Sequence, residues 1–213
     1  MNRRTRTLTA AAVGATLVLT GATMADAQGR LLGGREVRVM LPQGQSNPAI
    51  ATGVATGKDL AFYQSSGLGP TALNPSAPAD SPERYTDPSM TGGAEGVTVT
   101  EAQALVVLRN IAANLKAAGV EPKDVITMKC YLAKPPGAAV ADYAGWNRAY
   151  RQFFANVDLE TRQAVPVPMG SSAPKPPITA NAARPARATM EVTSLAVPGW
   201  LVEVEVTATY PRR

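Results

Sequence analysis

The sequence predicts an α+β domain in which two helices pack on one face of a mixed sheet. Apolar residues recur at steps of three and four between residues 100 and 119, which is the spacing of a helix with one buried face. A second segment, 143–154, carries an aromatic stripe at helical spacing. Five short runs typical of strands accompany these helices, and the expected order is β-β-α-β-α-β-β.

The first half of the domain is expected to contain two strands and the longer helix. The strands are predicted at residues 38–41 and 60–67, and a glycine stops the second one. Thr100 can open the helix, and Gly119 closes it. Its apolar face is predicted to consist of Leu105, Leu108, Ala112 and Leu115.

The second half is expected to contain the shorter helix and three strands. The strands are predicted at residues 124–132, 184–192 and 201–206, where apolar and polar residues alternate or β-branched residues cluster. We interpret the aromatic stripe of the helix at 143–154 as part of the core rather than as a cofactor site. The stripe consists of Tyr143, Trp146, Tyr150 and Phe153 or Phe154.

The N-terminal segment has the pattern of a secretory signal peptide, assigned to residues 1–27. Arginines precede a mostly apolar run from residue 8 to residue 24, which leads into Ala25-Asp26-Ala27. This run is shorter than the ~20 residues that a membrane-spanning helix needs. The mature protein is therefore expected to be exported, to the periplasm or beyond, without a membrane anchor. Arg3-Arg4 is similar to a twin-arginine signal, so the export route stays open.

Residues 28–213 are predicted to form a single domain with two loop inserts, near 67–96 and 157–184. Both inserts are dense in proline, glycine and small polar residues. Neither carries an apolar period, so neither is expected to form a core element.

Histidine is absent from the sequence, which excludes Ser-His-Asp and Cys-His catalysis and makes a catalytic zinc site improbable. The single cysteine, Cys130, has no partner for an intramolecular disulfide. It lies in an apolar strand-like run, so we expect a buried thiol rather than a nucleophile. No metal or cofactor is predicted.

The formal charge of +5 overstates how basic the mature protein is. The predicted signal peptide carries a net +2, which leaves about +3 on the rest of the chain. No run of lysines and arginines alternates with aromatic residues. A nucleic-acid partner is therefore not expected.

Two polar strand faces are the candidate functional surfaces. Side chains alternate along a strand, so Arg187, Thr189 and Glu191 share one face, and Glu203 and Glu205 share a face of the next strand. If these two strands are neighbours, a guanidinium that can fork onto a carboxylate lies close to an acid that can hold a water. This pattern is typical of a small hydrolytic site.

Four linked motifs resemble the RidA/YjgF family of reactive-intermediate imine deaminases. In chain order they are VLRNIAANLKAAG at 107–119, WNRAYRQFF at 146–154, PARAT at 185–189 and VEVE at 202–205. The resemblance extends over residues 100–210 and is weaker over 48–67. It implies a chorismate-mutase-like (YjgF-like) fold, a homotrimer with sites at its three interfaces, and hydrolysis of enamines and imines such as 2-aminoacrylate to 2-keto acids and ammonia without a cofactor.

The resemblance also implies roles for individual residues. Arg187 stands at the position of the arginine that binds the substrate carboxylate, and Glu203 at that of the acid that positions the attacking water. Asn147 and Ser66 match two further substrate-binding positions. Thr189 takes the place of a residue that is often Cys or Ser in the family.

Some assignments stay open at this point. Glu205 fits the water-positioning role as well as Glu203 on pattern alone, and Ser65 is an alternative to Ser66. The Gly-Pro-Tyr motif that supplies a tyrosine in the family reads Asn47-Pro48-Ala49-Ile50 here, without a phenol.

The expected partner is a small molecule that bears a carboxylate. The first alternative to a deaminase is a trimer of the same fold that binds carboxylate ligands without turnover. Ribonuclease activity, a third interpretation, ranks well behind both.

Overall fold

The computed structural model describes residues 31–91 and 96–210. The chain divides into two units, Met1–Leu31 and Leu32–Arg213, and every element below belongs to the second unit. The signal peptide assigned to residues 1–27 lies outside the described residues and stays a prediction. Within those residues, no helix is both long enough and apolar enough to cross a bilayer.

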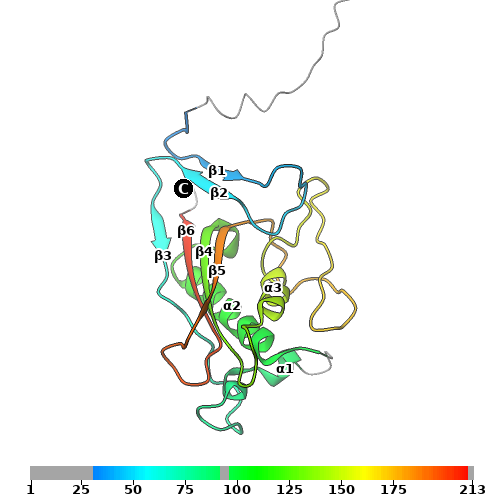
Figure 1. Ribbon diagram of the computed structural model, residues 1–213. Coiled ribbons are helices and arrows are strands. Elements are labelled where there is room, and N and C mark those ends of the chain that lie inside the picture. The colour runs from blue at the N-terminus through cyan, green and yellow to red at the C-terminus, as the bar shows by residue number, and fades with distance from the viewer. Residues whose placement is uncertain (1–30, 92–95, 211–213) are drawn as a thin grey trace, which may run out of the picture. The chain divides into compact units, whose positions relative to one another are not determined.

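The main sheet has four strands in the order β3-β6-β4-β5 (Figure 1). They are β3 (Phe62–Gln64), β6 (Val202–Thr209), β4 (Val125–Ala133) and β5 (Ala186–Val192). The β4 and β5 strands run parallel, whereas β6 is antiparallel to both of its neighbours. The sheet is therefore mixed, as the sequence predicts.

A separate hairpin precedes this sheet. It pairs β1 (Val37–Met40) with β2 (Gly53–Thr56) in antiparallel fashion. The strand β2 is not among those predicted from sequence, because its four residues are too few to show an apolar run or a clear alternation. Pairing with β1 stabilises the strand conformation there.

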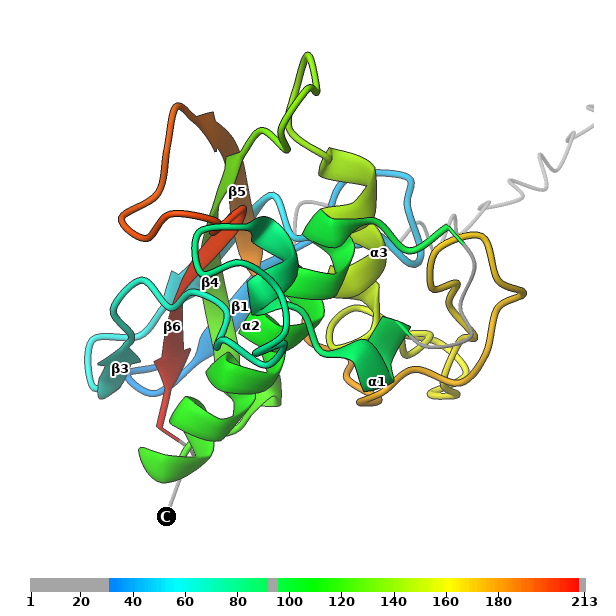
Figure 2. The ribbon, with the colours of Figure 1, turned by 90° about the horizontal axis from the view of Figure 1, so that it is seen from below.

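The two long helices are α2 (Val99–Ala117) and α3 (Tyr143–Arg151), and both lie on one side of the main sheet (Figure 2). The side chain of Thr98 accepts a hydrogen bond from the Glu101 amide, and this N-cap starts α2. At the other end Gly119 takes a φ of +78°, the left-handed conformation in which glycine ends helices. Short helical turns complete the order: η2 (Pro82–Tyr85), α1 (Pro88–Thr91) and η3 (Pro122–Asp124).

The core lies between the helices and the sheet. Leu105, Leu108 and Leu115 of α2 are all at least 99 % buried, as their helical spacing predicts. Most of the predicted aromatic stripe is core as well, with Trp146 and Tyr150 fully buried. Tyr143 is an exception: it lies in the first turn of α3 and is exposed. Opposite them lie the alternate side chains of the central strands: Met128, Cys130, Leu132, Val202, Val204 and Val206.

Both inserts contribute to this core, contrary to expectation. Met90 from the first insert and Val167 from the second are buried. Fully buried Gln103 holds the first insert by donating to the carbonyls of Pro82 and Gly199. Single side chains and backbone hydrogen bonds anchor such loops, and these leave no periodic pattern in a sequence.

The second insert is anchored in the same way. Buried Arg184 donates to the carbonyls of Pro48 and Val157, and Gln152 of the α3 C-cap donates to that of Pro168. The insert therefore leads into β5 along a defined path.

Candidate functional site

Arg187 lies on the helix-covered face of the sheet, although it is charged. It is paired with Met128 of β4, and directly opposed residues share a face. Its Nη2 atom donates to Oδ1 of Asn147 at 2.7 Å. The guanidinium carbon lies 4.3 Å from the centroid of the Tyr150 ring and 5.8 Å from that of Trp146. Two side chains of α3 therefore stack against the cation, and a third accepts its hydrogen bond.

One donor atom of this guanidinium is unused. The Nη1 atom of Arg187 is buried and has no hydrogen-bond partner among the described residues. The hydroxyl of Thr189, two residues along the same strand face, is buried and unpaired as well. Burial lowers the pKa of Arg187, but an arginine stays charged at any physiological pH. Buried, unpaired polar groups of this kind are uncommon in proteins, and here two of them lie on one strand face.

Cys130 is paired with Thr189 and is fully buried on the same face. Burial raises the pKa of its thiol, and the nearby Arg187 only partly offsets this effect. The thiol is therefore protonated and inert at neutral pH, as expected for a core cysteine.

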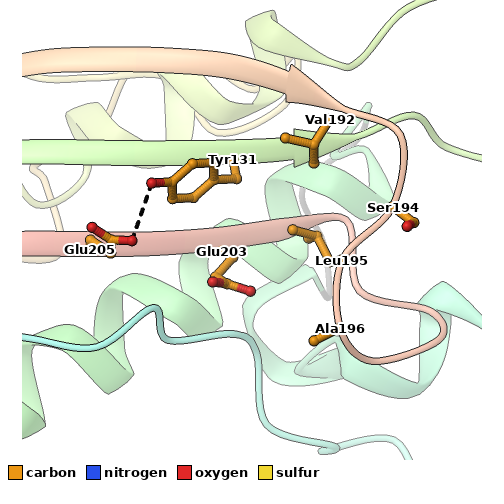
Figure 3. Close-up of a pocket in the computed structure, with 7 residues that line it drawn as sticks. All are labelled: Tyr131, Val192, Ser194, Leu195, Ala196, Glu203 and Glu205. Carbon is orange, nitrogen blue, oxygen red and sulfur yellow. Dashed lines mark hydrogen bonds between the residues drawn. The ribbon is translucent and has the colours of Figure 1, made fainter.

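Glu203 lies on the opposite face of the sheet. It is paired with Tyr131, whereas its neighbours Val202 and Val204 are paired with Leu132 and Cys130 of the buried face. A cavity of about 320 Å³ opens beside it. Its lining residues are Tyr131, Val192, Ser194, Leu195, Ala196, Glu203 and Glu205 (Figure 3).

The two acids in this cavity differ in their contacts. Glu205 accepts a hydrogen bond from the Tyr131 hydroxyl at 3.1 Å and pairs with Lys129 at 3.4 Å. Glu203 makes no hydrogen bond or ion pair to another residue in the described part of the chain. Its carboxylate is therefore available to a water or ligand, which favours Glu203 over Glu205.

Gly67 lies directly against this carboxylate. A Cβ atom at position 67 would overlap Oε1 of Glu203 and approach its Cδ to 2.8 Å. Ser66, the preceding residue, is exposed. Ser65 is buried, and its hydroxyl accepts a hydrogen bond from the Val206 amide at 2.9 Å. This geometry favours Ser66 over Ser65 as the serine that is free to contact a ligand.

The site residues form two groups. We call Arg187, Asn147 and Thr189 the arginine half-site, and Glu203, Gly67 and Ser66 the glutamate half-site. The idea that the strands of Arg187 and Glu203 are neighbours is wrong, because β4 lies between β5 and β6. The register places the two half-sites on opposite faces of one sheet.

The model of a known protein family matches residues 87–210, more than half of the chain, and its description is Endoribonuclease L-PSP. This chain belongs to the endoribonuclease L-PSP family, also known as the YjgF/Rid family. The α+β fold with its mixed sheet agrees with that membership. No curated protein sequence matches the chain significantly.

Several solved structures of the Rid family are similar to this chain at low sequence identity. The Rid protein YyfB from Yersinia pestis is 20% identical, with a TM-score of 0.45, over 81% of this chain and 98% of that one. A YjgF protein from Neisseria meningitidis is 19% identical, with a TM-score of 0.40, over 85% and 100%. TdcF from E. coli, solved with bound serine, is 20% identical, with a TM-score of 0.40, over 82% and 100%.

Three residues beside these half-sites are not among the site residues predicted from sequence: Gly67, Tyr131 and Tyr150. Tyr150 was assigned to the core, where it lies, but its ring also supports Arg187. The alternation of β4 indicates that Tyr131 lies on its polar face, but only the pairing of β4 with β6 places it beside Glu203. Among the described residues, no group of three or more Cys, Asp and Glu side chains is arranged to hold a metal ion.

Proposed function

We propose that this Rid-family chain is an imine deaminase, which hydrolyses small 2-imino acids and their enamine tautomers, such as 2-aminoacrylate, to 2-keto acids and ammonia without a cofactor. The observation that carries the proposal is the unpaired, buried Nη1 donor of Arg187. A cation held by Asn147 and Tyr150, with the Nη1 donor unpaired, is suited to a small anionic ligand.

The substrate carboxylate binds at this unpaired donor. A guanidinium presents its donors in a planar fork that matches the two oxygens of a carboxylate. Because Asn147 and the aromatic rings already fix the plane of Arg187, little side-chain freedom is lost on binding. The unpaired hydroxyl of Thr189 provides a further contact on the same side.

Glu203 supplies the base. Its carboxylate has no other partner among the described residues and borders an open cavity of about 320 Å³. It holds a water and removes a proton as that water attacks the imine carbon. Imine hydrolysis needs little more than positioning and a general base, which contributes roughly 10²- to 10⁴-fold.

A substrate that contacts both half-sites must lie between two copies of the chain. The side chains of Arg187 and Glu203 project from opposite faces of one sheet, so no small molecule contacts both within a single copy of the chain. The homotrimer implied by the family resemblance offers a solution, in which the arginine half-site of one copy meets the glutamate half-site of the next.

The test is release of ammonia and keto acid from freshly generated 2-iminopropionate and bulkier 2-imino acids. We expect the wild type to accelerate hydrolysis and Arg187→Ala to abolish the acceleration. Arg187→Lys should lose about 100-fold in kcat/KM although the positive charge is kept, because an ammonium group cannot replace the planar set of donors of a guanidinium. A fully active Arg187→Lys variant would contradict the carboxylate clamp.

A carboxylate-binding protein without turnover is the second candidate. One observation favours it. The segment 47–50 contains no tyrosine, and Ile50, its last residue, packs against the core. This segment therefore brings no phenol to the site. Calorimetric binding of pyruvate, lost in Arg187→Ala, together with no hydrolysis of any imino acid, would support this alternative. RNA degradation in the same preparation would instead favour the nuclease activity named in the family description.

We also propose that the protein acts outside the cytoplasm, on the evidence of its N-terminal sequence alone. Sequencing of the mature N-terminus is expected to begin at Gln28. An intact N-terminus on the protein isolated from its native cells would contradict export by a cleaved signal.

A further inference from the structure

We propose that Tyr131 is a catalytic residue of the glutamate half-site, whose phenol oxygen holds the attacking water together with Glu203. This inference rests on the proposed deaminase function and names a residue that neither the motifs nor the family resemblance assigns. It is carried by strand register, by a cavity and by one hydrogen bond.

The register places Tyr131 beside Glu203. The two residues are directly opposed on β4 and β6, so their side chains leave the same face of the sheet with Cβ atoms about 5 Å apart. Both line the cavity of about 320 Å³. Figure 3 shows both side chains on this face of the sheet, with the tyrosine hydroxyl directed toward Glu205 and the Glu203 carboxylate directed toward the loop that carries Leu195 and Ala196. A water bound to Glu203 therefore lies on the same face of the sheet as Tyr131 and in the same cavity.

A hydrogen bond fixes the direction of the phenol. Its proton is donated to Oε1 of Glu205 at 3.1 Å, and Lys129 holds Glu205 in turn at 3.4 Å. A tyrosine hydroxyl has one donor, which is thus occupied, and acceptor lone pairs that remain available. Desolvation, together with this contact with Glu205, raises the pKa of Tyr131, so the phenol keeps its proton. The oxygen therefore presents only acceptor capacity to the cavity.

This arrangement orients a water for attack. The water donates one hydrogen to Glu203 and the other to the Tyr131 oxygen, which leaves an oxygen lone pair free. That lone pair forms the C–O bond to the carbon of a protonated imine, the C=N electrons move to nitrogen, and Glu203 takes a proton from the water. The product of this step is a neutral carbinolamine.

Glu203 completes the reaction, and Tyr131 stays protonated throughout. The protonated Glu203 gives its proton to the amino nitrogen, the C–N bond breaks as the carbonyl forms, and the hydroxyl proton passes back to Glu203. Ammonia leaves and takes up this last proton as ammonium. The net change is protonated imine plus water to keto acid plus ammonium, so atoms and charge balance.

Tyr131→Phe tests the role, because it removes the phenol oxygen and keeps the ring. We expect kcat for 2-iminopropionate to fall about 10-fold, the effect of one lost hydrogen bond to the reacting water, while KM changes by less than about 2-fold. Tyr210→Phe is the matched control, since this exposed tyrosine lies outside both half-sites. It should retain wild-type kinetics, and both variants should keep the wild-type melting temperature.

A second variant separates catalysis from packing. Glu205→Leu removes the acceptor that directs the phenol, so kcat should fall here too, but the change should have no further effect in a Tyr131→Phe background. Additive losses would overturn the proposed link between these two side chains. A wild-type kcat in Tyr131→Phe, or a change confined to KM, would overturn the water-holding role while the deaminase stands. A wild type that hydrolyses no imino acid would overturn the deaminase itself, and this role with it.

Discussion

The guanidinium of Arg187 owes its position to residues that the chain order keeps apart. Asn147 and Tyr150 come from α3, three residues from each other and so on one side of the helix, and β5 passes beneath them. The helical spacing is readable from sequence. The approach of β5 to this side of α3 is a tertiary contact. From the pattern of its strand alone, Arg187 therefore cannot be distinguished from an ordinary polar residue of a strand.

Gly67 provides the sharpest residue-scale prediction for the glutamate half-site. Gly67→Ala places a methyl group where the Glu203 carboxylate lies, and this flexible side chain must move away. A displacement of about 1 Å in a catalytic group can cost about 100-fold, so we expect a loss of that size in kcat/KM with little change in melting temperature. Imine hydrolysis and thermal unfolding measure the two effects.

Gly33→Ala is the control for this substitution. A Cβ atom at position 33 meets only the Glu36 side chain, at ordinary contact distance, so activity should stay at the wild-type level. Equal activity of Gly67→Ala and Gly33→Ala would show that Glu203 does not depend on its position against Gly67.

Cys130 leads to a prediction about thiol reactivity. Burial raises the pKa of its thiol, so the thiolate that reacts with electrophiles is scarce across the neutral and mildly alkaline range. We expect no reaction with an aromatic disulfide reagent at pH 8 in the native state and one thiol per chain in denaturant. Rapid labelling of the folded protein would contradict the buried position.

At the scale of elements, an ion pair with a fully buried carboxylate and a partly buried arginine joins the two helices. Glu101 of α2 is fully buried and accepts two hydrogen bonds from Arg148 of α3, at 2.9 and 2.7 Å, and one from the Gly170 amide. Arg148→Ala leaves this carboxylate buried without its cation. We expect the free energy of unfolding to fall by about 3 kcal/mol or more in urea denaturation.

The control is an exposed ion pair on the same helix. Arg109 of α2 pairs with Asp87 at 3.0 Å, and the arginine side chain is half exposed. Arg109→Ala should change the free energy of unfolding by less than about 1 kcal/mol. Similar losses in the two variants would contradict the special role of the buried pair between the helices.

The elements also show how far the sequence alone leads. α2, α3, β4, β5 and β6 are long enough for their periodicity to be clear, and the structure confirms all of them. The strand expected at 60–67 is shorter, Phe62–Gln64, and β2 was missed. Strands of three or four residues depend on partners elsewhere in the chain and leave little local signal.

At the scale of the whole molecule, two half-sites on opposite faces predict complementation between copies. Arg187→Ala keeps an intact glutamate half-site, and Glu203→Gln keeps an intact arginine half-site. If neighbouring copies share each site, random co-assembly of the two inactive variants restores about a quarter of the sites. Imine hydrolysis by the co-refolded mixture measures this fraction.

Each variant refolded alone is the control and should stay inactive. A mixture as inactive as its components, in oligomers shown to contain both variants, would contradict a site shared between copies. Mixing also tests the assignment of Tyr131 to the glutamate half-site. A mixture of Tyr131→Phe and Glu203→Gln should be no more active than Tyr131→Phe alone, because both changes fall on the same half-site.

The sequence by itself determined the α+β class, the helices and long strands, the buried faces and the family, because these follow from side-chain periodicity and from motifs that are local in the chain. It also singled out Arg187 and Glu203. Only the tertiary structure decided that β4 separates their strands, that they face opposite ways, and that Glu205 is engaged while Glu203 is free. Strand order and register arise from contacts between segments that are distant in the chain. These contacts place Arg187 and Glu203 in separate half-sites, so a substrate that contacts both needs a second copy of the chain.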